Sequence, residues 1–112
     1  MSDSRTIAAT DEGLAVRTRV AAPSLTYGAS TVVTTAGTQV VLGADTACRS
    51  VHIRAKTGNT NNVYIGTSNV SSALNMKVLA AGELLEIAVK NVTELWIDVD
   101  TNGEGVDYWV TN

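Results

Sequence analysis

The sequence predicts an all-β fold, a single-domain β-sandwich or jelly roll of about eight antiparallel strands with an N-terminal arm. Val and Thr are the commonest residues, and their β-branched side chains suit a pleated strand better than a helix. Apolar and polar residues alternate in several runs, and Gly- and Asn-rich turn signals separate these runs. No segment sustains a helical apolar period, so a sandwich is the first expectation and a barrel the second.

The chain has 112 residues, which is the length of one domain. We expect an N-terminal arm at 1–13 and the sandwich domain at 14–112. The arm is polar, and its candidate interface residues are Ile7, Asp11 and Glu12. We expect such an arm to add a strand to the open sheet edge of a neighbouring subunit.

Eight segments are expected to be strands. In the first of them the apolar residues face one way and Arg17 and Arg19 face the other, which makes both arginines interface candidates. The stretch 68–79 is expected to be a long connection that holds one helical turn or a short strand. The expected strands span 14–20, 30–35, 38–43, 49–57, 62–66, 83–90, 94–100 and 105–111.

The same alternation predicts which side chains form the core. On the strand at 49–57, His52, Arg54 and Lys56 are expected to point to solvent. The residues expected to face inward on the later strands are Val51, Ile53, Ala55, Leu85, Ile87, Val89, Leu95, Ile97, Val99, Val106, Tyr108 and Val110.

Charge and hydropathy exclude several classes of partner. The net charge is -3 and no basic stripe is present, so binding to nucleic acid through its phosphates is not expected. The apolar runs are too short to span a membrane. The N-terminus lacks the apolar segment of a signal peptide, so we expect the protein to be made in the cytoplasm and used without Sec export.

The sequence favours a non-enzymatic protein without a cofactor. It contains one histidine, His52, and one cysteine, Cys48, and no nucleophile, phosphate-loop or metal-spacing motif. His52 is expected to be an exposed strand residue, because a catalytic role would need partners that the sequence does not place beside it. Cys48 is expected to be a small, buried apolar side chain.

One segment matches half of a calcium-binding loop. Asp98, Asp100 and Asn102 precede Gly103 with the spacing of the first half of an EF-hand loop. Trp109 stands where that loop needs its bidentate Glu, and the flanking segments have strand rather than helix patterns. A hairpin turn made of turn-favouring residues is therefore preferred over a calcium site.

The two tryptophans are the most conspicuous aromatic residues. Trp96 and Trp109 both fall on the side opposite the predicted core. If their strands pair, the two indoles come close together and form an interface anchor or a sugar-stacking platform. The alternative is that both belong to the packing of a two-layer sandwich.

The second half of the chain resembles small β-sandwich virion proteins of tailed bacteriophages. The resemblance covers residues 39–111 and consists of a strand, an Asn-rich turn, a strand ending in Gly, a Gly-Glu turn into a further strand, and two closing strands. The segments that carry it are 51–55, 61–66, 81–85, 95–98 and 106–110. Residues 1–38 have no counterpart in this pattern.

The resemblance implies a capsid decoration (cement) protein, which braces major capsid subunits on the outer surface of the phage head, often as a homotrimer. A head–tail or tail-fibre accessory protein is the alternative within the same class. A carbohydrate-binding module is the alternative from another class. Charged residues make up only 17% of the chain, which fits a surface that is largely covered by partners.

Overall fold

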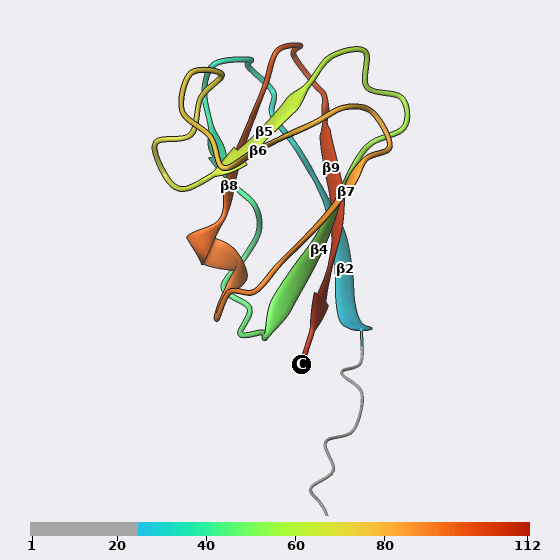
Figure 1. The fold of residues 1–112 in the computed structure, drawn as a ribbon, viewed down its shortest axis with the longest axis vertical. Coiled ribbons are helices and arrows are strands. Elements are labelled where there is room, and N and C mark those ends of the chain that lie inside the picture. The colour runs from blue at the N-terminus through green and yellow to red at the C-terminus, as the bar shows by residue number, and fades with distance from the viewer. Residues whose placement is uncertain (1–24) are drawn as a thin grey trace, which may run out of the picture.

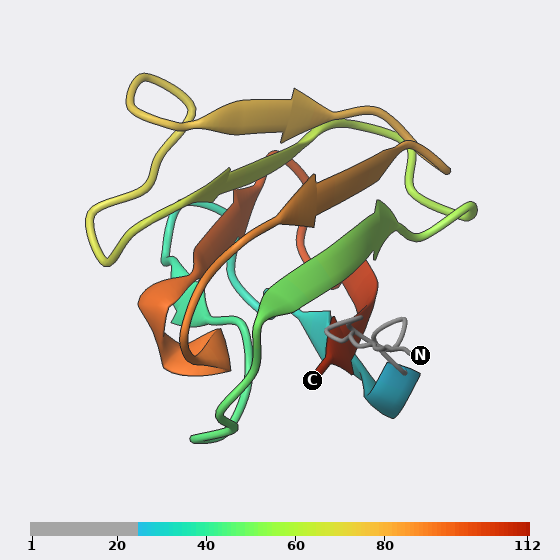
Figure 2. The same ribbon diagram turned by 60° about the horizontal axis from the view of Figure 1, so that its bottom comes forward.

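The computed structural model describes residues 25–112, which form two four-stranded antiparallel sheets packed face to face (Figures 1 and 2). The predicted all-β sandwich is confirmed. The predicted arm at 1–13, the strand at 14–20 and five interface candidates lie outside the described residues. These five are Ile7, Asp11, Glu12, Arg17 and Arg19.

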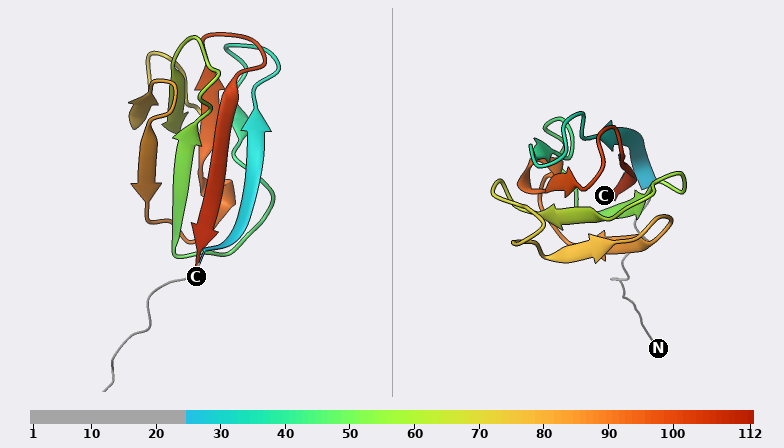
Figure 3. Two further views of the ribbon diagram at one scale, coloured as in Figure 1. Left: turned by 90° about the vertical axis from the view of Figure 1, so that its right-hand side faces the viewer. Right: turned by 90° about the horizontal axis from the view of Figure 1, so that it is seen from above.

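The first sheet has the strand order β2-β9-β4-β7. Its strands are β2 (Leu25–Val32), β9 (Gly105–Thr111), β4 (Ser50–Ala55) and β7 (Leu84–Ile87). In the register of the central pair, Val51 lies opposite Val110 and Ile53 opposite Tyr108. The left panel of Figure 3 shows this sheet face on, with β2 and β7 at its edges.

The second sheet has the order β3-β8-β5-β6. Its strands are shorter: β3 (Val40–Val41), β8 (Trp96–Val99), β5 (Val63–Gly66) and β6 (Lys77–Leu79). Before β8 the chain makes one 3-10 turn, η1 (Val92–Glu94), whose N-terminus is capped by the Asn91 side chain. No helix in residues 25–112 has the length and apolar composition needed to cross a bilayer.

Consecutive strands of the described chain alternate between the two sheets. Only the β5–β6 connection joins neighbours within one sheet, and every other described connection crosses from one sheet to the other. The described strands thus form a two-layer antiparallel sandwich in which most sequence neighbours lie in opposite sheets.

The core lies between the sheets and includes the side chains that the alternation predicted. It also contains six fully buried residues that were not predicted to face inward, Val33, Leu42, Val63, Ile65, Leu79 and Val92. The inner residues of β4 and β9 are essentially fully buried; among them are Val51, Ile53, Val106 and Val110. Leu85, Ile87 and Val89 pack against this cluster from the edge strand β7 and its extension. Tyr108 is the largest fully buried side chain.

Several predicted strand limits are wrong. The strand expected at 30–35 runs from Leu25 to Val32 instead, and that at 38–43 contains only the two residues of β3. The strand expected at 83–90 ends at Ile87, and that at 94–100 begins after η1. The connection at 68–79 does end in a short strand, β6.

The dipeptide Tyr27-Gly28, which carries a turn signal, lies inside β2. The glycine is required there by a neighbouring side chain rather than by a turn. A Cβ atom at Gly28 would lie 2.6 Å from Nε1 and 2.7 Å from Cδ1 of Trp109. Only a residue without a side chain leaves room for the indole at this position.

Candidate functional site

The outer side of the first sheet carries a flat array of aromatic, apolar and charged side chains. We call it the Trp109 face, and it consists of Ser30, His52, Arg54, Leu84, Glu86, Asp107 and Trp109. These residues alternate with the buried ones and therefore point away from the core. Two rows cross the sheet in register, Gly28–Trp109–His52–Glu86 and Ser30–Asp107–Arg54–Leu84.

Asp107 is the centre of an ionic network on this face. Its carboxylate accepts hydrogen bonds from Lys56 Nζ at 2.8 Å, Ser30 Oγ at 2.5 Å and Arg54 Nη2 at 3.1 Å. These donors, Lys56 first, lower the pKa of Asp107 from 3.8 to about 2. The carboxylate is therefore ionised at neutral pH, and it binds side chains from β2, from β4 and from Lys56 directly after β4.

The row that contains Trp109 joins this aromatic residue to the pair of His52 and Glu86. Trp109 is 38% exposed and lies directly opposite Gly28 on one side and His52 on the other. The Nε2 atom of His52 lies 3.7 Å from Oε2 of Glu86. At the β7 edge of the sheet, Leu84 is 70% exposed beside Arg54.

The second sheet carries an apolar surface at its β6 edge. We call it the β6 stripe, and it consists of Leu74, Met76 and Val78, which are 55%, 56% and 39% exposed. Val78 pairs with Tyr64 on β5, on the side away from the core, and Met76 lies two residues before it. Leu74 and Met76 also line one hollow of about 290 Å³ beside Gly66.

Each of the calcium candidates is engaged in structural hydrogen bonds. Asp98 is 3% exposed, and its Oδ1 accepts from the backbone N–H groups of Gly37 and Val99. Asp100 accepts from the phenol of Tyr64 at 2.7 Å, and Asn102 Oδ1 accepts from the Ala36 N–H at 2.7 Å. Within residues 25–112, no group of three or more His, Cys, Asp or Glu side chains is placed to hold a metal ion.

The structure does not bring Trp96 and Trp109 together. Trp96 belongs to β8 and Trp109 to β9, and these strands lie in different sheets. Both indoles alternate with core residues, so they point to the two opposite outer sides of the sandwich. The platform of two tryptophans is therefore wrong, and each tryptophan belongs to a separate surface.

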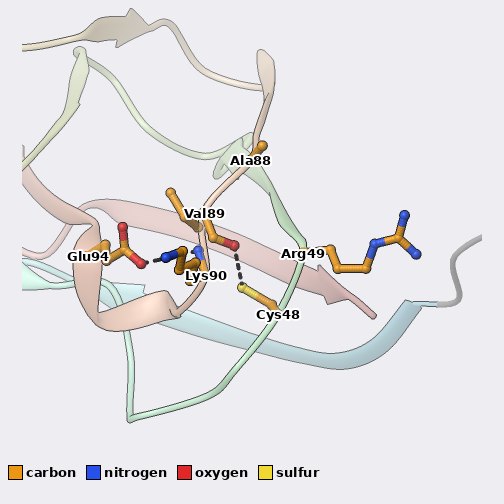
Figure 4. A pocket seen from close by; sticks show the side chains of 6 residues that line it. All are labelled: Cys48, Arg49, Ala88, Val89, Lys90 and Glu94. Atoms are coloured by element: carbon orange, nitrogen blue, oxygen red, sulfur yellow. Dashed lines mark hydrogen bonds between the residues drawn. The ribbon is translucent and has the colours of Figure 1, made fainter.

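An open pocket of about 790 Å³ lies beyond the Val51–Ile87 pair, lined by residues that precede β4 and residues that follow β7 (Figure 4). Cys48 Sγ donates to the carbonyl of Val89 at 3.4 Å, and Glu94 accepts from the backbone N–H of Lys90 at 3.1 Å. Burial, and then the nearby charge of Glu94, raise the pKa of the Cys48 thiol. The raised pKa favours the protonated thiol. Cys48 is half-buried rather than fully buried as expected.

Sequence reasoning found some residues of these surfaces and missed others. It placed His52, Arg54 and Lys56 on the outer side of β4, where the structure has them. It missed the role of Asp107, because the alternation shows its direction but not the two cations opposite it. It missed the β6 stripe, because Leu74 and Met76 lie in a connection without a strand pattern.

Comparisons with protein-family models, with curated proteins and with solved structures found no match to the chain.

Proposed function

We propose that this protein is a non-enzymatic structural protein of a tailed-bacteriophage particle. Its most specific form is a capsid decoration protein that binds the major capsid protein on the outside of the head. The sequence resemblance over residues 39–111 supports this proposal, and the sandwich fits it as a rigid element with short strands and tight turns.

The observation that carries the proposal is the β6 stripe. Three large apolar side chains, each at least 39% exposed, occur at alternate positions in and before the edge strand β6, and two of them, Leu74 and Met76, line one hollow. Soluble monomers rarely expose such residues in a group, and grouped ones mark protein–protein contacts. The adjoining hollow of about 290 Å³ offers a recess for an anchor side chain of a partner.

The partners proposed for this surface are subunits of the major capsid protein. We also propose that the chain forms a homo-oligomer, a trimer in the form that the resemblance implies. The protein would then be made in the cytoplasm of the bacterial host and be found on the exterior of the virion.

The test is the copy number of this chain in purified particles of the phage that encodes it. Gradient-purified virions are analysed by quantitative mass spectrometry against the major capsid protein. Hundreds of copies per head, absent from isolated tails, are expected for a decoration protein. A few copies that travel with tails would instead support a head–tail or fibre accessory role, and absence from particles would refute the proposal.

Two matched variants test the surface. Met76→Asp places a charge in the β6 stripe, and Leu84→Asp places the same charge on the opposite sheet at a side chain that is even more exposed. Decoration through the β6 stripe predicts that Met76→Asp is lost from particles and that Leu84→Asp is incorporated normally. Equal incorporation of both variants would place the contact elsewhere.

A further inference from the structure

The indole of Trp109 packs against the backbone of β2 at Gly28, and part of the indole surface is exposed to solvent. The contact distances at Gly28 put the pyrrole part of the ring directly over the backbone of β2. The side chain is nevertheless 38% exposed, so the ring is held in place without being covered. A held and open aromatic ring is a preorganised stacking surface, because little side-chain entropy remains to be lost on binding.

Hydrogen-bonding groups of both kinds surround this ring. On one side, Ser50 and Thr111 form a hydroxyl pair at 2.5 Å, but Thr111 is only 4% exposed, so its hydroxyl is not available to a ligand. Across β4, His52 and Glu86 offer an imidazole and a carboxylate that is 65% exposed. On the remaining side lies the ionic network of Asp107.

The Asp107 network holds the polar side chains beside the ring in place through ion pairs. Arg54 and Lys56 are both within 3.1 Å of the Asp107 carboxylate, and their side chains are still 39% and 32% exposed. The N–H groups on the exposed parts of these side chains can donate to a ligand without breaking the ion pairs, whereas Nε of Arg54 is buried. The rim therefore offers donors and acceptors in fixed positions around an apolar centre.

A ligand that fits this arrangement has one apolar face and many hydroxyl groups at its edge. A pyranose ring has this character, since its C–H face can stack on an indole while its hydroxyls both donate and accept. A purely apolar ligand would strip water from the charged rim without replacing its hydrogen bonds. A nucleotide would bring phosphates beside Glu86 and Asp107 on a chain of net charge -3.

We propose that the Trp109 face binds a pyranose-containing oligosaccharide, with the sugar stacked on Trp109 and its hydroxyls bound by His52, Glu86 and the Asp107 network. The site needs one tryptophan only. It lies on the sheet opposite the β6 stripe, so sugar binding is independent of the capsid role and is tested on the isolated protein.

The test is to titrate the full-length chain with maltohexaose, cellohexaose and chitohexaose. Binding is measured by isothermal titration calorimetry and by tryptophan fluorescence. Trp109→Ala is the site variant and Trp96→Ala is the matched control on the other sheet. We expect at least one of these sugars to bind the wild type. Trp109→Ala should weaken that binding at least tenfold, and Trp96→Ala should leave it within twofold.

Glu86→Gln provides a second variant, because this exposed side chain can be changed without disturbing the core. It should weaken sugar binding several-fold at unchanged melting temperature. Failure of all three sugars to bind at millimolar concentration would overturn the proposal. So would binding that Trp109→Ala leaves intact, or tryptophan quenching by AMP in place of the sugars.

Discussion

The Asp107 network makes a quantitative prediction about stability and pH. Its carboxylate has a pKa of about 2 in the folded protein and an ordinary value of 3.8. A difference of roughly 1.8 units at about 1.36 kcal/mol per unit corresponds to about 2.4 kcal/mol. Because the cations that face it are about a third exposed, solvent screening reduces this figure, and we expect ~1–2 kcal/mol.

The sign follows from the direction of the pKa shift. A carboxyl group whose pKa is lowered by folding stabilises the folded state above its unfolded pKa. That stabilisation is lost as the pH falls from about 4 to about 2. The Asp107→Asn variant lacks the titrating group, so it should be less stable than the wild type at pH 7 and should lose this part of the acid sensitivity.

The assay is urea unfolding followed by circular dichroism at several pH values between 2 and 7. Glu86→Gln is the control, since it removes a carboxylate from the same sheet face, and the Glu86 side chain is 65% exposed. We expect this control to follow the wild-type pH profile within about 0.5 kcal/mol. If Asp107→Asn matches the wild type at pH 7 and keeps the same slope below pH 4, the network does not stabilise the fold as argued.

Three further predictions concern other contacts. A Cβ at Gly105 would lie 2.0 Å from the backbone oxygen of Thr31, so Gly105→Ala should lower the free energy of unfolding by more than about 3 kcal/mol. A Cβ at Gly58 meets no atom within 4 Å, so the control Gly58→Ala should change it by less than about 0.5 kcal/mol in the same unfolding assay. Tyr64→Phe removes the hydrogen bond to Asp100 and should cost about 1 kcal/mol. That bond raises the pKa of Tyr64, so its contribution should be present at neutral pH and fade as the pH rises above 10, and an unchanged alkaline unfolding profile in Tyr64→Phe would contradict this. Cys48 should react with a thiol reagent at pH 8 far more slowly in the folded than in the urea-unfolded chain, and equal rates would show that burial does not protect it.

The parts of the fold that can be predicted from the sequence are those in which apolar and polar residues alternate along a strand. The inner residues of β4 and β9 were identified correctly because every second side chain of a half-buried strand must be apolar. The need for glycine at position 28 is different, because it arises from a contact with Trp109, a residue far along the sequence. Pairings at such separations leave no signal in a single sequence.

The turn at 101–104 shows the same limit. Tight turns between strands usually join hairpin partners, and the strands on either side of this one were considered as a pair. Here the turn carries the chain from one sheet to the other. It is held across the sandwich by bonds from Gly103 N–H to the Val33 carbonyl and from the Ala36 N–H to Asn102. Those partners, and not the turn residues themselves, decide that Trp96 and Trp109 face opposite ways.

The two proposed surfaces lie on opposite sides of one rigid core, and this arrangement has a consequence for particles. A chain attached through the β6 stripe would turn the Trp109 face away from the capsid. Many copies on one head would then present many weak sugar sites, and multivalency would convert them into firm adhesion. Particles carrying Trp109→Ala should keep the normal copy number and lose retention on a surface coated with the sugar that binds the isolated chain. Particles made with Met76→Asp should lose the protein and the retention together. If Trp109→Ala particles are retained like wild type, the outward face does not carry adhesion even where the isolated chain binds sugar.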